Sequence, residues 1–139
     1  MASVDDVDRV LRELEAVERG ARYGMPTWQV GKKAIAWERP FSKADLKRFG
    51  ALPPPAGPIL AVATADLDDK AALLGSGLAG LFTIEHFDGY PAVLVQLEHV
   101  ELDVLEDLLI EAWLRVAPAP AVERCHARGA GPPASHGDR

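Results

Sequence analysis

Apolar residues at helical spacing mark both ends of the part of this chain that is expected to fold. Near the N-terminus they recur every three or four positions after Ser3, a residue suited to cap a helix. This pattern predicts a helix that ends near Gly20. The strongest helical periodicity covers residues 102–116 and predicts the last helix. Each pattern gathers apolar side chains on one helix face, so both helices are expected to pack against a sheet.

The first predicted hairpin follows directly after the N-terminal helix. Its strands are Thr27–Val30 and Lys33–Glu38, which are rich in strand-forming residues. Gly31 and Lys32 lie between them and fit a two-residue turn with glycine at its first position.

Two short helices are predicted from their capping residues. Ser42 and Asp45 form a capping-box pattern, and Gly50 ends the helix that they begin. Asp66 is the cap of a second short helix, over residues 67–74. The apolar residues expected to be buried on the first of these helices are Leu46 and Phe49.

The remaining strands are predicted from apolar runs. Residues 59–64 form a short continuous run, which is typical of a strand covered on both faces. Strands over 80–85 and 91–97 are separated by Asp-Gly at 88–89, a strong hairpin signal.

The predicted order is therefore α-β-β-α-β-α-β-β-α. This order indicates an α+β domain, with an antiparallel sheet packed on its first and last helices. Residues 1–118 form the single predicted domain. Residues 119–139 are rich in Pro, Gly, Ala and Ser and are expected to be a disordered tail.

Composition indicates a globular protein, with 48% apolar and 26% charged residues. No apolar run approaches the roughly 18 residues of a membrane span, so no membrane partner is expected. The acidic N-terminus lacks an apolar signal core, and Cys125 is the single cysteine. These features predict a cytoplasmic protein without disulfides.

Charge is distributed unevenly along the chain. The net charge of −6 argues against avid nucleic-acid binding by the molecule as a whole. Residues 19–50, however, contain eight basic and two acidic residues, whereas residues 64–113 contain one basic and eleven acidic residues. Salt screens charges over about 10 Å, so the basic segment can face a polyanion despite the total charge.

Catalytic and ligand motifs are largely missing, and the sequence predicts neither an enzyme nor a cofactor. The segment GSGLAG at 75–80 follows a helix and enters a strand, which is the reverse of the dinucleotide-binding context. His86 and His99 have acidic neighbours, but solvated turn residues explain them better than a metal site does. No metal ligand is therefore predicted.

Four segments resemble the MmcQ/YjbR family: YGMPTW at 23–28, VGKKAIA at 30–36, HFDGYPAVLV at 86–95 and LEDLLIEAWLRVAP at 105–118. The resemblance covers roughly residues 4–118. It implies a compact α+β fold of the double-wing type, a DNA-binding label and no catalytic residues. Gly31, Lys32 and Lys33 match the family pattern where a wing is expected.

These observations lead to the hypothesis of a bacterial DNA-binding domain that contacts phosphates through the first hairpin and the second helix. The predicted contact residues are Lys32, Lys33, Arg39, Lys43, Lys47 and Arg48, with Trp28 and Trp37 as stacking platforms. Acidic residues around the second hairpin would repel phosphate, so this surface is expected to act alone.

Two alternatives stay open at this point. The basic residues can be ordinary solvated surface and the tryptophans ordinary packing residues. The chain can also be a non-catalytic module that binds a protein or an anionic small ligand in a pocket between sheet and helices. Buried tryptophans favour packing or a ligand, whereas exposed tryptophans among the basic residues favour nucleic acid.

Overall fold

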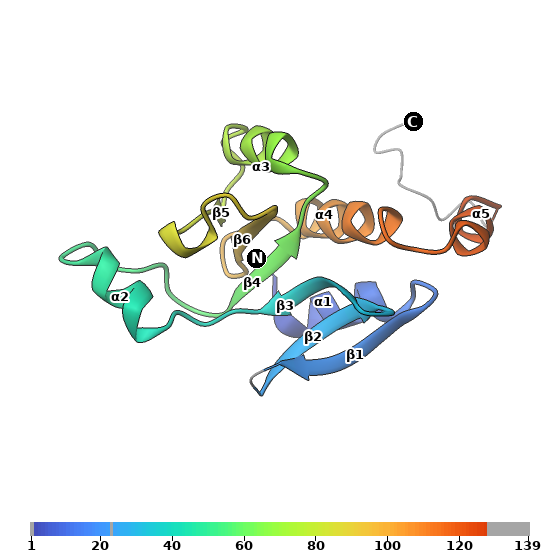
Figure 1. The fold of residues 1–139 in the computed structure, drawn as a ribbon, viewed down its shortest axis with the longest axis horizontal. Helices are drawn as coiled ribbons and strands as arrows, with labels where there is room; N and C mark the ends of the chain where they lie inside the picture. Colours follow the sequence, from blue (N-terminus) through green and yellow to red (C-terminus); the bar gives the residue numbers. More distant parts are fainter. Residues whose placement is uncertain (1, 23, 128–139) are drawn as a thin grey trace.

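The computed structural model describes residues 2–22 and 24–127, and Figure 1 shows how their elements are arranged. Within these residues, six strands form one antiparallel sheet in the order β1-β2-β3-β4-β6-β5. The strands are β1 (Val17–Arg22), β2 (Met25–Val30), β3 (Lys33–Glu38), β4 (Ile59–Ala63), β5 (Leu81–Phe82) and β6 (Ala92–Gln96). The helices are α1 (Val4–Arg12), α2 (Lys43–Phe49), α3 (Leu67–Leu74), α4 (Leu102–Leu114) and α5 (Ala119–Ala127), with a 3-10 turn, η1 (Glu85–Phe87). The predicted α+β class and antiparallel sheet are confirmed.

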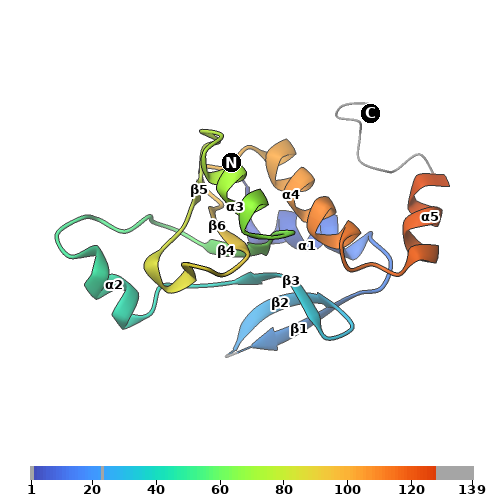
Figure 2. The same cartoon turned by 45° about the horizontal axis from the view of Figure 1, so that its top comes forward.

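Both faces of the central strands are covered. In β4, Leu60 and Val62 belong to the large core under α1 and α4, whereas Ile59 and Ala61 belong to a smaller core with Phe87 of η1. Adjacent residues of a strand point to opposite faces, so this division confirms that residues 59–64 contain a strand covered on both sides. Figure 2 shows α1 and α4 together on one side of the sheet.

The N-terminal helix is shorter than predicted. It ends at Arg12, with Glu13 as its C-cap, and residues 17–22 form β1 instead of continuing the helix. Ala16, whose φ is 68°, lies in the left-handed region where the chain turns into β1. Leu14 and Val17 continue the helical spacing in the sequence, but they pack on the large core from the loop and from β1.

The second hairpin also differs from the prediction. Its first strand has only two residues, β5, and pairs with β6. The chain between these strands forms η1, and Lys70 of α3 holds this segment in place. The Lys70 side chain is buried, and its Nζ donates hydrogen bonds to the carbonyl oxygens of Phe87 and Tyr90, the latter at 2.8 Å.

The expected disorder after residue 118 is wrong for residues 119–127, which form α5. Ala121 and Cys125 of this helix are buried in the large core, and Arg124 forms a 2.8 Å ion pair with Glu15. Proline fits within the first turn of a helix because its missing N–H would have no partner there, so Pro120 does not prevent α5. The rest of the predicted tail, residues 128–139, lies outside the described residues.

Both short helices begin as predicted. Ser42 and Asp45 form a complete capping box on α2, and the Asp66 side chain accepts a hydrogen bond from the N–H of Asp69 on α3. Leu46, which was expected to be buried, is 46% exposed. Nowhere among the described residues is a helix long and apolar enough to cross a membrane.

Candidate functional site

The predicted basic contact residues lie in two groups at opposite ends of β3. Lys32 and Lys33 are at the β2–β3 turn, whereas Lys43 and Lys47 are on α2, beyond the other end of the strand (Figure 1). A strand of six residues spans about 20 Å, so one continuous basic surface is not formed. All four lysines are exposed, and within the part of the chain that the structure describes none has a carboxylate partner.

The two predicted arginines are engaged by Asp45. Nη1 of Arg39 lies 2.9 Å from one Asp45 carboxylate oxygen, and Nη1 of Arg48 lies 3.5 Å from the other. Arg48 also pairs with Glu85 at 2.9 Å, and the Arg39 guanidinium lies over the Phe87 ring. These arginines therefore join α2 to η1, and both guanidinium groups are paired with carboxylates of the fold.

Asp45 is the buried centre of this cluster. Its burial by itself raises the pKa of the carboxyl, because the charged form loses solvent. This effect of burial is outweighed by hydrogen bonds from the Ser42 N–H, from Arg39 and from the Ser42 hydroxyl, and by the positive charge of Arg39. The pKa of the Asp45 carboxyl therefore lies below its usual range. The carboxylate is thus ionised and structural at neutral pH.

The tryptophans proposed as stacking platforms are packing residues to different degrees. Trp28 is only 1% exposed, and its indole N–H donates a 3.0 Å hydrogen bond to Asp8. Arg19 covers the ring at 5.5 Å and also pairs with Asp8. Trp37 is half-buried in the smaller core and meets Tyr90 edge-on. Trp28 has no exposed face on which a base could stack.

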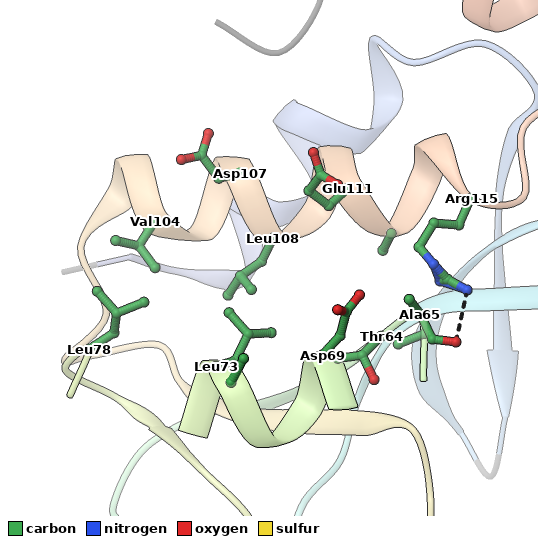
Figure 3. A pocket seen from close by; sticks show the side chains of 13 residues that line it. Thr64, Ala65, Asp69, Leu73, Leu78, Val104, Asp107, Leu108, Glu111 and Arg115 are labelled. Atoms are coloured by element: carbon green, nitrogen blue, oxygen red, sulfur yellow. Dashed lines mark hydrogen bonds between the residues drawn. The ribbon is translucent and has the colours of Figure 1, made fainter. Parts of the chain in front are cut away.

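A groove that sequence reasoning missed lies between α3 and α4 (Figure 3). Its volume is about 510 Å³, which falls within the range of small-molecule sites. Its lining is mostly apolar. The lining residues are Ala63, Thr64, Ala65, Asp69, Ala72, Leu73, Leu78, Val104, Asp107, Leu108, Glu111, Ala112 and Arg115.

The walls follow from helical geometry. Residues three and four apart share a helix face, and on α3 this face carries Asp69, Ala72 and Leu73. On α4 the corresponding face includes Leu108 and Ala112. Alanine at one of these positions on each helix leaves room that larger side chains would fill. The α4 pattern was visible in the sequence, but nothing there placed α3 opposite it.

Acidic residues dominate the charge of the groove. Asp69 and Glu111 project from facing helices, and Asp107 lies at the rim, pointing away from α3 (Figure 3). Among the described residues none of these carboxylates has an ion-pair partner. Arg115, the single basic residue of the lining, instead donates to the carbonyl oxygen of Ala65 at 3.3 Å.

Lys70 fixes the orientation of α3. Its side chain leaves the helix on the side away from the groove and binds the two carbonyl oxygens near η1, so that Asp69 faces α4. Burial lowers the pKa of Lys70, and the nearby Asp88 charge partly opposes this shift. Lys70 is the one basic residue of the acidic segment 64–113, and its two hydrogen bonds anchor the α3 wall of the groove.

No three histidine, cysteine, aspartate or glutamate side chains converge to hold a metal ion in residues 2–22 and 24–127. His86 and His99, whose neighbours include acids, are both exposed. The groove lining carries no histidine, cysteine or lysine.

Comparison with known proteins gives relatives without an established activity. The chain is 44% identical over 126 residues to "Uncharacterized protein Rv2570" of Mycobacterium tuberculosis, and the match covers 88% of this chain and 95% of the relative. "Uncharacterized protein Mb2600" of Mycobacterium bovis matches to the same extent. No protein-family model matches the chain. No solved structure matches it. The chain belongs to the family of these uncharacterised mycobacterial proteins.

Proposed function

We propose that this protein is a non-catalytic binding domain that holds a small molecule in the groove between α3 and α4. The observation that carries the proposal is the groove itself, with an apolar floor and a few charged groups at its edge. Ligand sites typically combine an apolar lining with a small number of polar groups. The burial of Trp28 adds support, because it favours packing or ligand binding over base stacking.

Filling the groove is expected to abolish ligand binding without unfolding the protein. Ala72 is exposed and lines the groove, so Ala72→Phe places a ring in the free volume. Ala71 is the matched control, because it is exposed on the same helix but does not line the groove. Amide chemical shifts are followed by NMR while tryptamine, 3-ethylindole and indole-3-acetate are titrated in turn.

At least one of the three compounds should shift the amide signals of α3 and α4 in the wild type and in Ala71→Phe. The same compound should leave Ala72→Phe unchanged. If none of the three perturbs the groove signals, or if Ala72→Phe binds as well as Ala71→Phe, the groove is not the ligand site.

A second candidate function is nucleic-acid binding, in line with the MmcQ/YjbR resemblance. The observation that favours it is the set of four exposed lysines at the two ends of β3, none of which pairs with a carboxylate of the described residues. Phosphate contacts need only accessible positive charge and supply most non-specific affinity. The contact would be made by Lys32, Lys33, Lys43 and Lys47, while Arg39 and Arg48 maintain the fold.

Removing either lysine pair is expected to weaken binding of a duplex of about 20 base pairs and to flatten its salt dependence. Each lost phosphate contact reduces the slope of log affinity against log salt by about 1. Fluorescence polarisation at about 50 and 200 mM salt compares Lys32→Glu/Lys33→Glu with Lys43→Glu/Lys47→Glu. Arg22→Glu, on the exposed strand β1, is the control for a charge reversal outside both lysine pairs, with half their change in net charge. Absence of binding by the wild type at the lower salt concentration rules this candidate out.

A further inference from the structure

We infer that the ligand of the α3–α4 groove is an organic cation, a protonated amine or quaternary ammonium carried on an apolar body about the size of an aromatic ring. This inference rests on the proposed function, since it specifies the ligand of the same groove. It differs from the anionic ligand considered from the sequence, and the charge of the groove is the reason for the difference.

The apolar part of the groove accounts for the body of the ligand. Leu73 of α3 and Leu108 of α4 face each other across it, and Leu78 and Val104 close one end (Figure 3). Leu78 is 38% exposed, so it offers apolar surface that a bound ligand would remove from water. A ring placed between these side chains would remove apolar surface from water on both of its faces.

The charged part of the groove accounts for the sign of the ligand. Asp69 belongs to α3 and Glu111 to α4, the two helices that form the walls, so a cation in the groove would be attracted by both carboxylates. Arg115 does not neutralise Glu111, although it follows four residues later on the same helix, because it reaches to the Ala65 carbonyl instead. An anion in the groove would therefore be repelled by Asp69 and Glu111, whose two negative charges outweigh the single positive charge of Arg115.

Glu111 is not explained by the stability of its own helix. It lies in the last turn of α4, where the helix dipole disfavours negative charge, and this turn has no basic residue. Asp69, by contrast, lies in the first turn of α3, where a carboxylate is favourable. A bound cation beside Glu111 would offset the unfavourable interaction between this carboxylate and the negative end of the α4 dipole.

The cation is organic because the carboxylates do not form a chelating set. Among the residues that the structure describes, no three acidic, histidine or cysteine side chains converge closely enough to hold a metal ion. Separated carboxylates around an apolar floor suit a single positive group attached to a hydrophobic body.

The test uses the same three indoles, which share a ring but differ in charge. Dissociation constants for tryptamine, 3-ethylindole and indole-3-acetate are measured from the NMR titrations of the wild type. Tryptamine should bind about tenfold more tightly than neutral 3-ethylindole, since two carboxylates near the surface contribute roughly that factor, and indole-3-acetate should bind most weakly. The variant Asp69→Asn/Glu111→Gln should remove the preference for tryptamine.

Glu106→Gln serves as the control, because Glu106 is on α4 but does not line the groove. It should keep the full preference for tryptamine. If 3-ethylindole or indole-3-acetate binds the groove as tightly as tryptamine, the cation inference is overturned while the proposed function stands. If tryptamine binding is unchanged in Asp69→Asn/Glu111→Gln, or falls equally in Glu106→Gln, the two groove carboxylates do not select the ligand and the inference fails.

Discussion

Replacing Asp45 with alanine is expected to lower the free energy of unfolding by about 3–5 kcal/mol, the range seen when one partner of a buried ion pair is removed. The Asp45 side chain is 1% exposed, and its loss leaves Arg39 facing a site without a counter-charge. The Ser42 N–H would lose its acceptor as well. Urea unfolding followed by tryptophan fluorescence measures the change.

The control is Asp68→Ala, because Asp68 is an exposed acidic residue in the first turn of α3. Its replacement should cost well under about 1 kcal/mol, as is usual for surface charges. A loss of the same small size in Asp45→Ala would mean that the cluster around Asp45 does not hold α2 to η1.

The contribution of Asp45 to stability should depend on pH in a defined direction. The folded-state pKa of Asp45 is lowered, so its stabilising effect is fully present above the unfolded-state pKa of about 3.9. This effect is lost as the pH falls through the folded-state pKa. The stability difference between the wild type and Asp45→Asn should therefore shrink as the pH is lowered from about 5 to about 2.

Replacing Trp28 with alanine is expected to cost about 3–5 kcal/mol, as for other large residues removed from a core. The indole fills the space under α1 and donates a hydrogen bond to Asp8. Trp28→Phe keeps most of the ring volume but loses that bond to a charged acceptor, so a smaller cost of about 1.5–3 kcal/mol is expected. Both values come from urea unfolding, and Trp113 provides the fluorescence signal.

Trp28→Phe also separates packing from stacking. If the ring is structural, any affinity of the folded protein for single-stranded DNA should be unchanged in this variant. The half-buried Trp37 provides the comparison, with Trp37→Phe measured in the same assay. Unchanged stability together with weaker DNA binding in Trp28→Phe would show that the stacking hypothesis was right for Trp28.

Local signals predicted those parts of the fold whose determinants are close in sequence. The Gly31 turn joins β2 and β3 as expected, and Gly31 has the positive φ of 60° that such a turn requires. The capping box of α2 and the cap of α3 are present as predicted. In each case the interacting groups are within four residues of each other, so that neighbouring side chains alone determine the geometry.

The elements that sequence reasoning missed depend on distant partners. Strand β1 has only Val17 half-buried, so it shows no alternation, and its pairing with β2 defines it. Helix α5 depends on Cys125 and Ala121 reaching a core built from the other elements. The same reason applies to the candidate site, because Asp69 and Glu111 are brought together only by the packing of α3 and α4.

The two edge strands of the sheet also affect whether copies of this protein can pair with one another and aggregate. An uncovered strand exposes backbone N–H and C=O groups that can pair with another chain and begin a fibrous aggregate. One edge of this sheet is β1, an exposed strand that carries the charged residues Glu18, Arg19 and Arg22. The opposite edge, β5, has two residues and offers little backbone to extend. The open sheet is thus protected at both edges against ordered aggregation.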